Sequence, residues 1–133
     1  MFVEKITIIR FRKPSKTTLN EELQWFGNSL GLFNLRDKDK SCFRVFIELL
    51  KAAKMQSPLS SDDIAQKLDL TRATVLHHIN NLMERGMVLQ IREGYVLREA
   101  RLKDLMEDLR HDSEKAYEDL ERVAEQIDAM IGL

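Results

Sequence analysis

Two adjacent histidines, His77 and His78, lie in the middle of the stretch TRATVLHHINNLMERG, which runs from residue 71 to residue 86. An imidazole can bind a metal ion, form hydrogen bonds to a nucleic acid or fill space between helices. Neighbouring positions on an α-helix point about 100° apart, so these two rings cannot chelate one ion together. The pair therefore favours contact with a nucleic acid or packing between helices.

The apolar residues of this stretch predict an amphipathic helix. At about 100° per residue, one side carries Val75, Leu76, Ile79, Leu82 and Met83. His77 points almost directly away from that side, whereas His78 lies at its border. Thr71 is the expected N-cap, and Gly86 is the expected C-terminal stop. We therefore expect His77 to be exposed and His78 to pack inside the domain.

The elements on either side of this helix are expected to position it. The segment CFRVFIELLKAAK predicts a helix whose apolar stripe consists of Phe43, Phe46, Ile47, Leu50 and Ala53. The short segment DDIAQKL predicts a second helix, capped by Ser60 or Ser61, and a tight turn follows it. After Gly86, the run MVLQIREGYVLR predicts a β-hairpin with Gly94 at its tight position. This order of elements is that of a helix-turn-helix followed by a wing.

The same segment resembles the winged helix-turn-helix of the arsenical-resistance-repressor and multiple-antibiotic-resistance-repressor types of regulator, which are common in bacteria and archaea. The matching features are an alanine in the first short helix, a hydrophobic turn residue, a capping threonine, a histidine before an aliphatic residue, and a glycine before an apolar pair. In this sequence they are Ala65, Leu70, Thr71, Thr74, Val75, His78, Ile79, Leu82, Gly86, Met87 and Val88. The resemblance covers residues 42–98 and implies duplex DNA as the partner.

Candidate DNA-binding residues follow from this placement. In this motif, base contacts come mostly from the N-terminal part of the second helix, and a long basic side chain there can contact a phosphate or a guanine edge. The wing tip adds one basic residue. The expected DNA-binding set is Thr71, Arg72, Ala73, Thr74, His77, Asn81 and Arg92. A solvated polar face with no ligand is the simpler alternative.

The last part of the chain predicts a long helix. Between residues 99 and 131 there is neither glycine nor proline, and apolar residues recur at alternating steps of four and three. The seam is Leu102, Met106, Leu109, Ser113, Ala116, Leu120, Val123, Ile127 and Met130. Such a helix is longer than the domain, so its far half needs another partner. We expect a homodimer formed through these residues, Ser113 being the polar interruption; folding back over its own N-terminal helix is the alternative.

Residues 3–12 alternate in a way that predicts a β-strand, and a helix is expected from the cap Thr18 to the stop Gly31. The expected organisation is thus residues 1–39 as a supporting strand and helix, residues 40–98 as the winged domain, and residues 99–133 as the dimerisation helix. The fold class is mainly α with a small β wing.

Charge divides along the same lines. Residues 1–98 carry a net charge of +5 and residues 99–133 a net charge of −6. This division suggests that only the body faces a polyanion. The single cysteine, Cys42, and the absence of a long apolar run or a signal peptide indicate a cytoplasmic protein that crosses no membrane.

Neither catalysis nor metal binding is indicated. His111 stands three residues from both Asp108 and Glu114, but there is no second histidine nearby and no cysteine pair. No nucleophile and base stand in a recognisable pattern, and no glycine-rich phosphate loop is present. We expect a non-enzymatic transcriptional regulator, more specifically a repressor, without metal or cofactor.

Two other readings stay open. One is a winged helix used for protein contact in a transcription assembly or another assembly, which an acidic or apolar surface around Thr74 and His77 would favour. The other, compatible with the first reading, is a small-molecule effector pocket near Trp25 and Phe33, although core packing also explains these two aromatic residues.

Overall fold

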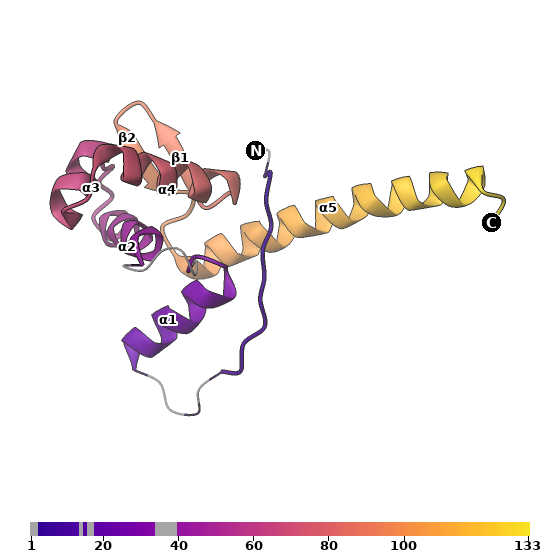
Figure 1. The fold of residues 1–133 in the computed structure, drawn as a ribbon, viewed down its shortest axis with the longest axis horizontal. Helices are drawn as coiled ribbons and strands as arrows, with labels where there is room; N and C mark the ends of the chain where they lie inside the picture. The colour runs from indigo at the N-terminus through magenta and orange to yellow at the C-terminus, as the bar shows by residue number, and fades with distance from the viewer. Residues whose placement is uncertain (1–2, 14, 16–17, 34–39) are drawn as a thin grey trace.

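The computed structural model describes residues 3–13, 15, 18–33 and 40–133 of the 133-residue chain. Along these residues the elements are α1 (Leu19–Ser29), α2 (Ser41–Lys54), α3 (Ser61–Leu68), α4 (Arg72–Glu84), β1 (Val88–Ile91), β2 (Gly94–Leu97) and α5 (Leu102–Met130). Helices α2 to α4 and the hairpin form one body, from which α5 extends away (Figure 1). The predicted fold class, mainly helical with a two-stranded wing and a long last helix, is confirmed.

The core lies where α2, α3 and α4 meet the hairpin. Its largest fully buried side chains include Phe46, Ile64, Ile79 and Leu82. On α2 the predicted stripe is on the inner side, since Phe43 and Phe46 are buried and Ile47, Leu50 and Ala53 pack, half-buried, against the core. Val45 and Leu49 are fully buried as well and were not part of the predicted stripe.

Local capping fixes the ends of these helices. The hydroxyl of Ser60 accepts the backbone N–H of Asp63 at 3.0 Å, and the Asp63 carboxylate accepts the N–H of Ser60 at 3.2 Å, which makes a capping box for α3. Asp69 then turns the chain in the left-handed region, at φ 55°. Thr71 caps α4, and Gly86 follows it at φ +77°, both as predicted.

The hairpin pairs Val88 with Leu97 and Ile91 with Gly94, so only Arg92 and Glu93 form its loop. Gly94 belongs to β2 rather than to the turn, which corrects the sequence interpretation. A Cβ at Gly94 would come within 2.6 Å of the carbonyl oxygen of Leu59, because Leu59 and Tyr95 exchange two backbone hydrogen bonds. The glycine therefore permits the close approach of the chain between α2 and α3.

The prediction of a β-strand over residues 3–12 is wrong, because the described segment 3–13 is extended but pairs with no strand. Its N–H groups bond to helix ends instead. Glu4 and Lys5 both donate to the Glu84 carbonyl, at 3.0 and 3.1 Å, and Ile9 donates to the Ser29 carbonyl at 2.8 Å. The last carbonyls of a helix have no hydrogen-bond partner within that helix. The segment therefore supplies N–H donors to carbonyls at the ends of both α1 and α4.

Helix α1 begins and ends as predicted, with Thr18 as its N-cap and Gly31 at φ +69° beyond its end. The expected domain boundary at residues 39–40 falls partly outside the described residues. Trp25 donates its indole N–H to the Phe11 carbonyl at 3.2 Å, and the Phe33 ring packs on Phe43 with centroids 4.8 Å apart. Both aromatic residues therefore have packing partners.

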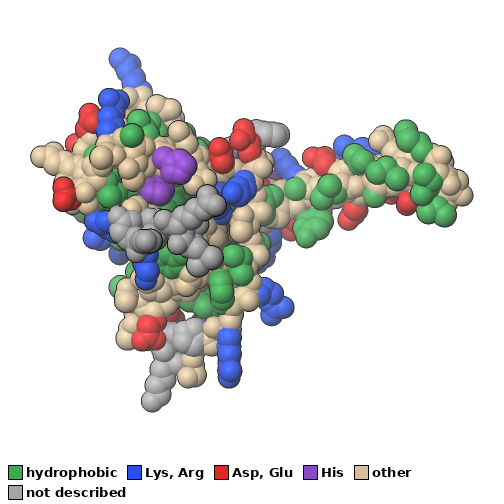
Figure 2. Space-filling model, viewed as in Figure 1, with side chains coloured by type: hydrophobic (Ala, Val, Ile, Leu, Met, Phe, Trp, Pro, Cys, Tyr) green, Lys and Arg blue, Asp and Glu red, His purple; other side chains and the backbone are tan. Residues whose placement is uncertain are grey.

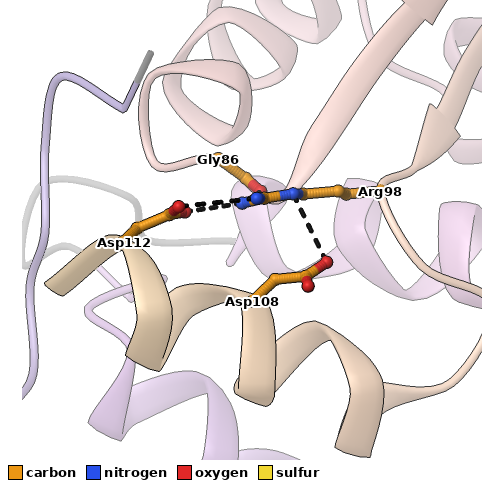
Figure 3. A network of polar contacts seen from close by, with 4 residues as sticks. All are labelled: Gly86, Arg98, Asp108 and Asp112. Atoms are coloured by element: carbon orange, nitrogen blue, oxygen red, sulfur yellow. Dashed lines mark hydrogen bonds and ion pairs between the residues drawn. The ribbon is translucent and has the colours of Figure 1, made fainter. Parts of the chain in front are cut away.

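Arg98, which directly follows β2, joins the wing to α5 (Figure 3). Its guanidinium donates to the Asp112 carboxylate and lies 3.4 Å from the carboxylate of Asp108, while a third, longer contact of 3.5 Å reaches the Gly86 carbonyl. The hydrogen bond to Asp112 raises the pKa of Arg98 despite the opposing effect of burial. One side chain therefore connects the end of α4, the wing and the first half of α5.

Replacing Arg98 by alanine is expected to lower the free energy of unfolding by about 2–4 kcal/mol, because Asp112, only 10% exposed, would lose its cation. Urea denaturation followed by circular dichroism measures this loss. The control is Arg101→Ala, an exposed residue just before α5, with an expected change below about 0.5 kcal/mol. Equal losses in the two variants would contradict the assigned role of Arg98.

Candidate nucleic-acid interface

Helix α4 presents the residues that the sequence assigned to DNA. Arg72, Ala73 and His77 are exposed, while Thr74 and Asn81 are half-buried on one flank. His78 is 9% exposed and belongs to the interior. The expected division between the two histidines is confirmed as far as exposure is concerned, and Figure 2 shows histidine side chains at the surface of the domain.

The N-terminus of α4 combines a cap with outward hydroxyl groups. The Thr71 hydroxyl oxygen accepts the backbone N–H of Thr74 at 3.1 Å and lies 2.8 Å from the Thr74 hydroxyl. If Thr74 donates in that pair, the Thr71 hydroxyl accepts twice and its own hydrogen can point outward to an anionic oxygen. Capping and a phosphate contact are thus compatible at Thr71.

Arg72 lies in the first turn of α4 and pairs with Asp62 of α3, with 3.6 Å between Nε and the carboxylate. The two side chains are 67% and 76% exposed, so the pair contributes at most about 1 kcal/mol. A phosphate or a guanine edge can therefore compete for this guanidinium.

One flank of α4 borders a hollow of about 700 Å³. The α4 residues Thr74, His77, His78 and Asn81 line it together with Lys5 and Arg85, and among the described residues of its lining Asp69 is the single acidic one. Its opposite wall includes Leu32, Ser41 and Cys42. The surface around Thr74 and His77 is thus polar with a small excess of positive charge, neither the acidic nor the apolar patch that protein contact would favour.

The wing adds less charge than the helix does. Arg92 is exposed at the hairpin loop, but Glu93 beside it is exposed as well. The backbone contacts of the loop leave both side chains at the tip, so the wing offers one cation and one anion.

Sequence reasoning missed three residues near this surface. Asn80 is exposed on α4, three residues after His77, where helical spacing already placed it near the polar face. Lys5 and Arg85 were missed because only the fold brings the N-terminal segment to the end of α4. Arg85 also donates to the Leu30 carbonyl at 2.8 Å, which fixes α1 against α4.

The structure gives no sign of a metal site in the part of the chain that it describes, where no group of three or more His, Cys, Asp or Glu could hold an ion. Asp108, which spacing placed near His111, instead contacts Arg98.

Comparison with known families decides what kind of domain this is. Residues 47–88 match the model of the winged helix-turn-helix DNA-binding family, a range that runs from within α2 to the first residue of β1. The segment is a winged helix-turn-helix DNA-binding domain. This agrees with the resemblance seen in the sequence, although the match does not distinguish between the two types of repressor named there. No curated protein matches the chain.

Within the described residues, no helix combines the length and the apolar character that a bilayer span requires.

The two histidines give a direct test of this surface. His77→Ala is expected to change the free energy of unfolding by less than about 0.5 kcal/mol, because the ring is exposed, while weakening DNA binding by about 1 kcal/mol or more. His78→Ala is expected to cost about 1–3 kcal/mol of stability, because it leaves a cavity in the domain. Thermal unfolding and fluorescence anisotropy with labelled duplex DNA measure the two quantities.

The interface assignment fails if both histidine variants bind DNA as the wild type does. A loss of DNA binding in His78→Ala alone, under conditions where that variant is fully folded, would also contradict it.

Proposed function

We propose that this chain is a sequence-specific transcriptional regulator that binds duplex DNA as a homodimer and represses the genes it controls. It acts without catalysis, and its α4 helix enters the major groove. The observation that carries the proposal is the polar, exposed N-terminal half of α4 in a winged helix-turn-helix DNA-binding domain.

The DNA contacts divide by chemistry. Arg72 and the Thr71 hydroxyl are suited to phosphate oxygens, which position the domain. His77, with Ala73, Thr74, Asn80 and Asn81 around it, is suited to base edges, because small and hydrogen-bonding side chains can enter the groove closely. Arg92 is the candidate phosphate contact of the wing.

The exposed half of α5 supports the homodimer. Leu120 is 65% exposed, Ile127 51% and Met130 84%, and they continue the seam that begins at Leu102. A regular apolar stripe of this size on a charged helix is typical of a surface that another helix covers. A two-fold dimer would also present two α4 helices to a pseudo-palindromic site.

Repression is supported by the resemblance to two types of repressor, and the charge division fits it. The acidic α5, with its net negative charge, would lie away from the phosphates. A mobility shift with the protein's own upstream DNA tests the proposal, with unlabelled upstream DNA and unrelated DNA as competitors. Equal competition by the two DNAs would contradict sequence specificity.

Replacing Arg72 by alanine is expected to weaken binding to all duplex sequences and to reduce the slope of log K against log salt by about 1, because one phosphate contact is lost. The matched control is Lys51→Ala on α2. Lys51 is 68% exposed against 67% for Arg72, and it likewise pairs with a carboxylate, that of Glu48. Anisotropy titrations over a range of salt concentrations measure both slopes, and an unchanged slope for Arg72→Ala would contradict the contact.

A further inference from the structure

A groove of about 250 Å³ lies between the N-terminal segment, the end of α4 and the first half of α5. Its walls are mostly apolar, with Ile6 and Ile8 on one side and Met106 and Leu109 on the other. Lys5, Arg85 and Arg110 also line it, and no acidic residue is among the described residues of its lining. The groove therefore fits an apolar partner that carries negative charge.

The second half of α5 has this composition. From residue 118 to residue 130 it contains five acidic residues and one basic residue, and its seam residues Leu120, Val123, Ile127 and Met130 are at least half exposed. The axes of two packed helices lie about 8–10 Å apart, close to the Debye length of about 8 Å in physiological salt, so charges that border the contact still interact. Parallel packing would oppose the two acidic halves, whereas antiparallel packing brings each acidic half to the cationic groove.

The seam is also symmetric about Ala116 to within one residue. In an antiparallel pair centred there, Leu102 faces Met130, Leu109 faces Val123, and Ala116 faces its own copy. Each half-buried position near the body thus meets an exposed position from the far half. The small side chains Ser113 and Ala116 lie at the centre, where two helices that cross closely need room.

The apolar surface of the far half is wider than one helix can cover. Tyr117 and Ile131 stand on the flank of the seam, 14 residues apart, and both are 67% exposed. Ala124 lies midway between them and is exposed too. A helix with such a broad stripe packs against two neighbours. The N-terminal segment, where Ile8 is 67% exposed, supplies the second neighbour beside the first half of α5.

We propose that the far half of α5 from a second copy of this chain, Leu120 to Met130, occupies the groove between the N-terminal segment and the first half of α5, in an antiparallel dimer. The proposal rests on the homodimer of the proposed function and adds its orientation and its second contact. The N-terminal segment is then part of the subunit interface.

Disulfide cross-linking separates the two orientations. The double variant Ser113→Cys, Leu120→Cys is expected to form a covalent dimer under mild oxidation, because these two positions come within one residue, about 1.5 Å along the axis, of facing each other in the antiparallel pair. Within one chain they stand seven residues apart, about 10 Å along the helix, too far for a disulfide. Either single variant is expected to stay uncross-linked, because its two copies would be about 9–12 Å apart along the axis.

Ala116→Cys is the control for dimer formation, since it faces its own copy in both orientations. The wild type, whose single cysteine Cys42 is buried, is the blank. Cross-linking of Leu120→Cys alone would establish a parallel pair and overturn this inference while leaving the homodimer intact. A monomer in light scattering, with no cross-link of Ala116→Cys, would overturn both. A dimer in which Ala116→Cys does not cross-link would overturn the antiparallel arrangement alone.

The groove itself is tested by Ile8→Glu, which would place a carboxylate against the acidic helix. Its dimer dissociation constant is expected to rise at least roughly tenfold, because like charges brought together at an interface cost several kcal/mol. The matched control is Met55→Glu, with no expected change, because Met55 follows α2, is 78% exposed and does not line the groove. Unchanged dimerisation of Ile8→Glu would remove the N-terminal segment from the interface.

Discussion

The Arg98 guanidinium is the interaction on which the arrangement of this molecule depends. It contacts the carboxylates of Asp108 and Asp112 on α5 and the Gly86 carbonyl that follows α4. The guanidinium is mostly buried, so moving the two carboxylates away from it would leave a charge without its partner, which costs free energy. Because Arg98 directly follows β2, the wing, the end of α4 and the start of α5 are held at one point.

This constraint determines what the rest of α5 can do. The first half of the helix lies on the body, where Leu105 is fully buried, and its 29 residues extend about 43 Å. A straight helix that is fixed at one end cannot fold its far half back onto the same domain. The far half is therefore exposed, as Figure 1 shows. Any protein that covers it would be coupled rigidly to α4, so the separation of two α4 helices in a dimer would be set by α5 rather than by a flexible linker.

Sequence reasoning succeeded where the information is local. Thr18, Ser60 and Thr71 each cap a helix through their own hydroxyl, and Gly86 stops α4, because these bonds form within four residues along the chain. It failed where partners are distant. Alternation over residues 3–12 predicted a strand, but the acceptors nearest to its N–H groups are the free carbonyls at the ends of α1 and α4. Gly94 is needed because the Leu59 backbone lies against it, and Arg98 is important because it binds Asp112. Neither contact can be detected from the spacing of residue types along the sequence. The outer face of α4 was predictable from helical period alone, whereas the cations beside it, Lys5 and Arg85, were not.

The charge division of the chain follows from the same geometry. In the proposed function the basic body approaches DNA, and the acidic helix would have to stay away from the phosphates. The ion pairs of Arg98 with Asp108 and Asp112 hold α5 in one direction relative to α4. The negative far half then needs a positive surface that is not the DNA face. Lys5, Arg85 and Arg110 provide one beside the first half of α5. Arg85 belongs to both surfaces, because it lines the hollow along α4 as well as this groove. It also donates to the Leu30 carbonyl. A contact made by a partner helix at this groove would therefore act on the residue that supports the end of α4, which would give the proposed dimerisation a direct physical route to the helix proposed to read DNA.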